Sequence, residues 1–370
     1  MATTEEIVEL LKFIGGFEKW PVLIEDCRRE VVKYLDYESR FKLGICSKND
    51  HETVEKTKIC VESVSILDNE SFLEEELDNV TFRIRFPNGN SIKWFFSQIG
   101  QDTRVRWYHD IPKQRPVIKK VIWKSCDYYE QAVKFAEKWM KKSNFELEAI
   151  TIEMKMYPFD TSQIKSLPCC KDVRICADDV DSFDWWLKKV PEQLDDFQLD
   201  EYSEDQKALT LPPDFLNAPQ IMQASRFYFW CRVAFSDEQL LKLKAKSMHF
   251  DSVNVTDKGI NKFIRNWVFG KAVDGFTNLC LCSTTVRDPD VMMAGLDEVK
   301  EWDEAFENEH CEFVEDFKKC CGHGQCYQIK SKVNPFESLT LSIHDNRLGI
   351  YATGKRVENN GEACTYYRVP

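Results

Sequence analysis

Two short amphipathic segments lie near the start of the chain, in the stretch WPVLIEDCRREVVKYLDYESRFKLGICSKND. Trp20 and Pro21 open this stretch as the first turn of a helix does, because proline has a fixed φ that suits a first turn. The apolar side chains of the first segment are Val31, Val32 and Leu35, and those of the second are Phe41, Leu43, Ile45 and Cys46. This three-to-four spacing predicts two helices packed on each other, with Ser47 to Asp50 closing the second.

Alternation of apolar and polar residues predicts strands after Cys60. The runs are Ile59 to Leu67, Val80 to Phe86 and Ser91 to Phe96. Between the last two runs lies Pro87-Asn88-Gly89-Asn90, and Asn-Gly accepts the positive φ of a tight hairpin turn. We expect a small β-rich unit that connects the helical module to the rest of the chain.

A strand–helix rhythm follows from about residue 117 to residue 286. Short β-type runs are centred near Ile122, Ile152, Ile175, Leu199, Tyr228, Val253 and Leu281, at intervals of 23 to 30 residues. Helical patterns between them cover Tyr128 to Lys142, Ser182 to Lys189, Asp237 to Lys246 and Asp257 to Phe269. This period is close to that of a leucine-rich-repeat solenoid, in which each unit buries its apolar face by stacking on its neighbours. The repeated asparagine and leucine signature is absent, so a non-repetitive α/β domain is the alternative.

The last part of the chain adds one helix and a β-unit. The helix covers Asp297 to Phe317, and β-type runs follow between Tyr327 and Tyr351. The fold class expected is therefore α+β or α/β: a small helical module, an irregular leucine-rich-repeat-like strand–helix region and a terminal β-unit. The domains expected are residues 1–55, 56–116 and 117–370.

These patterns are similar to those of a known family. The proline entry, a first helix ending in Tyr34-Leu35-Asp36 and a second ending in Cys46-Ser47-Lys48 resemble an F-box of the expanded nematode F-box family. The segment TDKGINKFIRNWVFGKAVDGFTNLCL resembles the F-box-associated domains of the same proteins. The alternative for the first segment is an ordinary helical hairpin that caps a domain.

The resemblance implies a function. Such a module docks on the Skp-type adaptor of a cullin-based ubiquitin ligase, and the remainder of the chain recruits a protein target for degradation. The docking face would be apolar, and the adaptor-binding residues expected are Pro21, Leu23, Val31, Leu35, Phe41 and Leu43. The competing function is a stand-alone repeat-like scaffold for protein–protein interaction, and an exposed first apolar face favours the adaptor.

Composition narrows the class of protein. Lys and Arg total 50 against 62 Asp and Glu, and this net charge of −12 argues against nucleic-acid and anionic-membrane binding, which need surplus positive charge. No apolar run approaches the roughly 20 residues that span a bilayer, and the first residues are acidic, unlike a signal peptide. We expect a cytoplasmic or nuclear protein. The 15 cysteines are scattered, so we expect most of them to be reduced and buried, Cys60 among them.

One cluster carries ligand chemistry. Cys320, Cys321, His323 and Cys326 have the donor types that suit zinc, although a flexible loop explains the intervening glycines equally well. No phosphate-binding, dinucleotide-binding or hydrolase motif is present, so we expect a protein that is not an enzyme and has no cofactor. A locally basic stretch is a candidate surface for an acidic partner, with a solvated strand face as its alternative; it holds Arg104, Arg106, Lys119 and Lys120 around Trp107 and Trp123.

Overall fold

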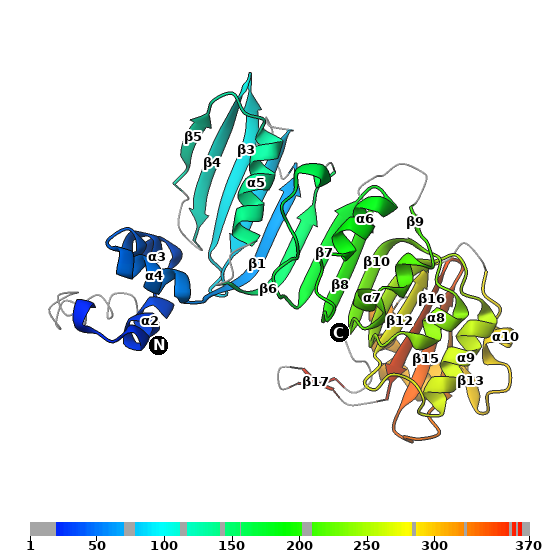
Figure 1. The fold of residues 1–370 in the computed structure, drawn as a ribbon. Helices are drawn as coiled ribbons and strands as arrows, with labels where there is room; N and C mark the ends of the chain where they lie inside the picture. Colours follow the sequence, from blue (N-terminus) through cyan, green and yellow to red (C-terminus); the bar gives the residue numbers. More distant parts are fainter. Residues whose placement is uncertain are drawn as a thin grey trace. The chain divides into compact units, whose positions relative to one another are not determined.

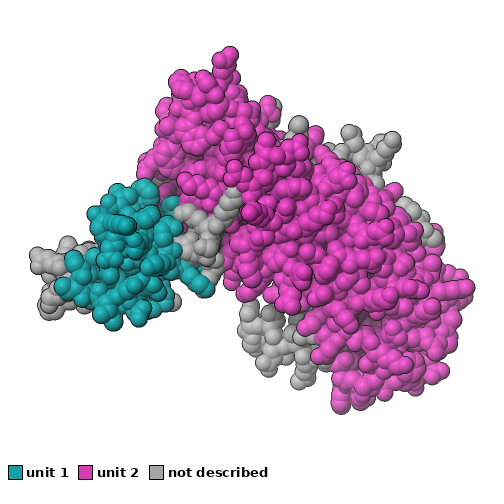
Figure 2. Space-filling model, viewed as in Figure 1, with its two compact units in different colours: residues 1–61, 142–146 teal, residues 62–141, 147–370 magenta. Residues whose placement is uncertain are grey.

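A computed structural model describes the chain over residues 20–69, 78–111, 117–140, 145–155, 157–201, 209–282, 286–321, 324–354, 357–359 and 362–364. The chain forms two compact units, one of residues 1–61 with 142–146 and one of residues 62–141 with 147–370. Figure 2 shows them in teal and magenta. The chain is a mixed α/β protein with a large mixed sheet, as its sequence predicts at the level of fold class.

Over residues 20–56 the chain forms three helices where the sequence predicts two. They are α2 (Glu25–Lys33), α3 (Tyr37–Gly44) and α4 (Lys48–Lys56), preceded by a short 3-10 turn over residues 20–22. The segment expected to close the second helix instead begins the third, because the Ser47 side chain accepts a hydrogen bond from the Asp50 amide. Asp36 caps α3 in the same way through the Ser39 amide. Pro21 therefore lies in a separate turn, ahead of the first helix rather than inside it.

Unit 2 is built on one sixteen-stranded sheet. Its first part is antiparallel, in the order β1-β2-β3-β4-β5. These strands are β1 (Ile59–Asp68), β2 (Asn79–Arg85), β3 (Ser91–Ile99), β4 (Asp102–Asp110) and β5 (Lys119–Trp123). Helix α5 (Tyr128–Met140) packs on one face, where Phe135 and Trp139 contact Phe82 and Trp94 (Figure 1).

The middle part of the sheet is parallel, in the order β6-β7-β8-β10-β11-β12. The strands are β6 (Phe145–Glu153), β7 (Asp172–Ala177), β8 (Asp196–Glu201), β10 (Arg226–Val233), β11 (Ser247–Ser252) and β12 (Asn278–Cys282), and the short β9 (Thr210–Leu211) pairs with β10. The helices between them are α6 (Val180–Leu187), α7 (Pro219–Met222), α8 (Asp237–Lys242) and α9 (Asp257–Val268), with 3-10 turns η2 (Phe159–Thr161) and η3 (Phe215–Asn217).

This parallel series agrees with the predicted strand–helix rhythm except at its start. The run around Ile122 is β5, which pairs antiparallel with β4, whereas the parallel series begins with β6, which lies next to β1. Helix α5 therefore follows an edge strand of the antiparallel part rather than a repeat strand. The run around Ile122 is thus a strand, as predicted, but it is not a member of the parallel series.

The sheet ends in a second antiparallel part, in the order β12-β16-β15-β14-β13. Its strands are β13 (Val299–Glu301), β14 (Gln325–Lys330), β15 (Ser338–His344) and β16 (Arg347–Thr353), with helices α10 (Pro289–Met293), α11 (Glu304–Glu309) and α12 (Cys311–Cys321). A separate hairpin joins β17 (Val357–Asn359) and β18 (Glu362–Cys364). Within the residues described, the helices are too short or too polar to cross a membrane.

Candidate docking surface

The helical module of unit 1 closes around a small core. Trp20, Val32 and Val54 are buried together, and Val31, Leu35 and Leu43 pack against them. The indole Nε1 of Trp20 donates to Asp50 Oδ1 at 2.5 Å, and Asp50 also accepts from the Ser47 hydroxyl at 2.7 Å. These bonds hold Trp20, the residue before Pro21, against the first turn of α4.

A buried arginine, Arg40, ties the same helices together through backbone oxygens. Its Nε donates to the carbonyl of Leu35, just after α2, at 3.1 Å, and its Nη2 donates to the carbonyl of Lys33, the last residue of α2, at 3.2 Å. Its Nη1 donates to the carbonyls of Thr57 and Lys58, just beyond α4, at 3.3 and 3.2 Å. Burial lowers the pKa of this guanidinium, yet an arginine in a protein keeps its proton. Arg40 therefore donates hydrogen bonds to backbone carbonyls near the ends of α2 and α4, which have no acceptor role within their own helices.

Six large apolar side chains of this module remain exposed. They make up six of the seventeen such exposed side chains in the described chain, although the module holds only residues 20–56: Val22, Leu23, Ile24, Tyr34, Phe41 and Ile45. Tyr34 is 84%, Phe41 61% and Ile45 70% exposed. Phe41 and Ile45 are four residues apart, which places them on one face of α3 and its C-terminal residue. So dense an exposed apolar surface is typical of a protein-binding site.

The six residues predicted to bind an adaptor divide into two groups. Pro21, Leu23 and Phe41 are exposed, whereas Val31, Leu35 and Leu43 are partly buried against the core of the module. Residues that sequence reasoning left out of the site are Val22, Ile24, Tyr34 and Ile45. The spacing of the second segment did include Ile45 together with Phe41, and both are exposed, so this apolar face packs on the first helix only through Leu43.

The predicted cysteine–histidine cluster falls mostly outside the described residues. The side chains of Cys320, Cys321 and His323 lie there, while Cys326 is buried in strand β14. In the part of the chain that is described, no three His, Cys, Asp or Glu side chains gather closely enough to hold a metal ion. Cys60, which was expected to be buried, is exposed.

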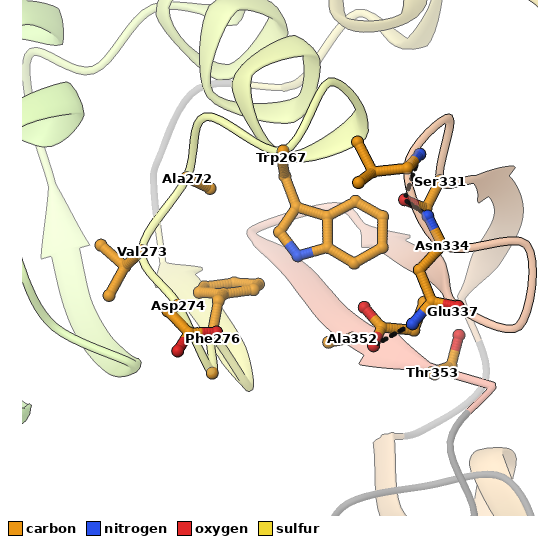
Figure 3. A pocket seen from close by; sticks show the side chains of 13 residues that line it. Trp267, Ala272, Val273, Asp274, Phe276, Ser331, Asn334, Glu337, Ala352 and Thr353 are labelled. Atoms are coloured by element: carbon orange, nitrogen blue, oxygen red, sulfur yellow. Dashed lines mark hydrogen bonds between the residues drawn. The ribbon is translucent and has the colours of Figure 1, made fainter.

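A pocket of about 260 Å³ lies in unit 2 beside the C-terminal end of α9 (Figure 3). The Trp267 indole lies between the loop from α9 to β12 and the loop from β14 to β15. The second loop is internally bonded, since Asn334 donates to Glu337 at 2.8 Å and the Ser331 hydroxyl accepts from the Asn334 amide at 3.1 Å. The lining side chains include carboxylates but neither histidine nor cysteine.

The basic stretch of the sequence is divided between two faces of the sheet. Trp107 pairs with Trp94 and Lys119, and the Trp94 ring lies 5.3 Å from Phe135 of α5, so these residues belong to the α5 side. Arg106 pairs with Phe95 and Lys120, and these three belong to the opposite side. Arg104, two residues from Arg106, is on that side as well, so three of the four cations share one face and Lys119 lies on the other with Trp107.

Comparison with known proteins finds a relative that matches along the whole chain. The chain is 41% identical over 376 residues to "Uncharacterized F-box protein T20B12.4" of Caenorhabditis elegans, and the match covers 100% of this chain and 97% of that protein. No family model matches the chain, and no solved structure does.

Proposed function

The chain belongs to the nematode F-box family, and on that basis we propose that it is the substrate-recruiting adaptor subunit of a Skp-cullin-F-box-type ubiquitin ligase. The membership confirms the family resemblance read from the sequence. Under this proposal the chain performs no catalysis and needs no cofactor, because ubiquitin transfer takes place on other subunits. Its place of action would be the cytoplasm or the nucleus.

The observation that carries the proposal is the exposed apolar surface of the helical module. A Skp-type adaptor would bury exposed apolar side chains of the module, namely Val22, Leu23, Ile24, Tyr34, Phe41 and Ile45. Burying one large apolar side chain contributes about 1.5–3 kcal/mol. Val31, Leu35 and Leu43 pack against the core of the module, so their part in docking would be to hold the helices in place. Pro21 would contribute by fixing the direction of the chain ahead of α2.

The larger unit would present the target-binding surface. We infer that its parallel series is an irregular leucine-rich-repeat-like array, because each of α6, α8 and α9 joins two neighbouring or nearly neighbouring parallel strands. In such arrays the strands offer one long face that the helices leave open. We keep residues 1–55 as the F-box-like module, 56–116 as the connecting β-unit and 117–370 as the F-box-associated region.

Binding of the full chain to a purified Skp-type adaptor tests the proposal. The double variant Phe41→Asp, Ile45→Asp places two charges in the proposed interface, and we expect at least about 3 kcal/mol of lost binding energy, or more than about 100-fold in Kd. Ile99→Asp is the matched control, because Ile99 is an exposed isoleucine of unit 2 that lies outside the surface. Equal affinity of the double variant and the control would refute the docking surface. No binding by the wild-type chain would favour a stand-alone interaction scaffold.

A further inference from the structure

The parallel strands of unit 2 have one apolar and one polar face. Every second residue of β10 is buried: Phe227, Phe229, Cys231 and Val233. Figure 1 shows α6 to α9 on one side of these strands, which accounts for the buried residues. The alternate residues point to the other side: Arg226, Tyr228, Trp230 and Arg232. Helices α11 and α12 pack on this side only further along the sheet, where Trp302 and Phe317 meet Tyr351 of β16.

Trp230 is the exposed centre of this polar side. Its side chain is 62% exposed, whereas Trp20, Trp94, Trp139, Trp186, Trp267 and Trp302 are all buried. It lies where the register between β10 and β11 shifts, between Phe229 and Arg232. Such irregularities re-aim side chains and are common next to functional sites.

The Trp230 ring is held by its neighbours. It lies 4.7 Å from the His249 ring on β11, and His249 is stacked with Tyr228 at 6.3 Å. Tyr228 and His249 are direct partners in the strand register. A rigid aromatic group loses little conformational freedom on binding, and for this reason tryptophan and tyrosine are frequent anchors of protein interfaces.

Arginines surround this aromatic group and cover the aspartates that pair with them. The Arg226 side chain is 41% exposed and Asp196 beneath it 13%, at 3.6 Å. The Arg232 side chain is 40% exposed and Asp251 31%, at 3.4 Å. A guanidinium has five N–H groups and each aspartate engages only some of them, so the outer edge still offers donors. Each of these two arginines is thus more exposed than the aspartate that pairs with it.

Arg347 adds a cation without an acidic partner. It lies on β16, its side chain is exposed, and its Nε donates to the Cys280 sulfur at 2.9 Å. Within the described residues, no carboxylate forms an ion pair with it. Its charge is close enough to lower the pKa of His249, after the larger effect of burial, so His249 stays neutral and adds no charge of its own. Three further carboxylates lie on the same side. Asp200 is on β8, the strand next to β10, and pairs with Arg174 at 2.6 Å, whereas Glu153 and Asp172 lie two or more strands from β10.

We name this surface the arginine–tryptophan face and define it by Arg226, Tyr228, Trp230, Arg232, His249 and Arg347. The geometry points to this face as the site that binds an extended, carboxylate-bearing segment of a target protein, with a large apolar side chain of that segment against Trp230 and a carboxylate on Arg347. The inference rests on the proposed function, since it names the class of target that the adaptor recruits. An acidic segment fits because Arg226 and Arg232 are more exposed than the aspartates that pair with them, and because Arg347 forms no ion pair with a carboxylate of the described residues.

A random dodecapeptide library selected on immobilised full-length protein tests the inference. We expect the enriched peptides to combine Asp or Glu with Trp, Phe or Leu. Fluorescence anisotropy on a synthetic copy of an enriched peptide should show binding about tenfold weaker or more for Trp230→Ala and for Arg347→Glu, and weaker binding as salt is raised. Matched controls are Phe336→Ala, an aromatic of the β14–β15 loop that is more exposed than Trp230, and Lys138→Glu, an exposed cation of α5. Both should bind like the wild type.

Three results would overturn the inference: no enrichment, enrichment of basic peptides, or affinities that both face variants leave unchanged. Circular dichroism of each variant excludes misfolding as the cause of a loss. Binding to the Skp-type adaptor, measured on the same variants, separates this inference from the proposed function. If the chain binds the adaptor but selects no peptide, only the arginine–tryptophan face is refuted. If the chain selects peptides but does not bind the adaptor, only the ligase role is refuted.

Discussion

Replacing Arg40 with methionine tests whether one buried guanidinium holds the helical module together. The four hydrogen bonds at 3.1 to 3.3 Å join the ends of α2 and α4, and methionine keeps the apolar stem while removing every donor. A hydrogen bond to a charged group contributes about 1.5–3 kcal/mol. The four contributions do not add, because the wild-type protein also bears the cost of burying a cation, which the lowered pKa of Arg40 records.

We therefore expect a loss of about 3 kcal/mol in the local unfolding free energy of residues 20–58, or roughly 150-fold in the opening equilibrium. Native-state hydrogen exchange of the amides of α2 to α4 measures this quantity without unfolding unit 2. The matched control is Lys48→Met, which removes a cation at an exposed position of α4 and should change stability by about 0.5 kcal/mol or less. A loss below about 1 kcal/mol for Arg40→Met would show that the helices pack without the guanidinium, and would refute the reasoning.

Three further changes have expected outcomes. Trp20→Phe removes the bond to Asp50 and leaves a buried carboxylate short of a donor, so denaturant unfolding should show a loss of about 1–3 kcal/mol. Gly270→Ala should destabilise unit 2 by about 1 kcal/mol or more in urea, because its φ is +68° and a Cβ would lie 2.8 Å from Val333. Burial lowers the pKa of His249 in the folded chain, so below about pH 6.5 the unfolded chain binds a proton at this residue more readily and the unfolding free energy falls. His249→Gln should make this fall of the unfolding free energy with pH less steep. An unchanged slope would contradict the prediction.

Local elements could be predicted from the sequence where one stripe or one alternation dominates. Helix α9 has a clear apolar stripe ending at Trp267. Strand β10 alternates in burial but not in sequence, because Phe227 to Cys231 is a continuous apolar run, so the exposure of Trp230 could not be predicted. Helix α4 was missed because its sequence KNDHETVEK has almost no apolar residues, and because Ser47 and Asp50 suit the end of a helix as well as its beginning.

Long-range pairing could not be predicted, since no local pattern records it. Strand β16 returns beside β12, and Ile350 pairs there with Leu279, about seventy residues earlier in the chain. The role of Arg40 was equally hidden, because an arginine on a short amphipathic helix has the pattern of a solvated residue. Its acceptors are carbonyls of other elements, which carry no sequence signature. Three of the six predicted docking residues, Val31, Leu35 and Leu43, are partly buried, because apolar spacing along a helix does not tell a face that packs within the module from one that stays exposed.

The central claim is that the exposed apolar surface of the helical module binds a Skp-type adaptor. Hydrogen–deuterium exchange of the full chain with and without the purified adaptor tests it most directly, because it locates the contact. The account predicts slower exchange in residues 22–24 and 34–45, with no change in β10, the strand that carries Trp230. Protection confined to unit 2, or no protection in the helical module at saturating adaptor, would contradict it.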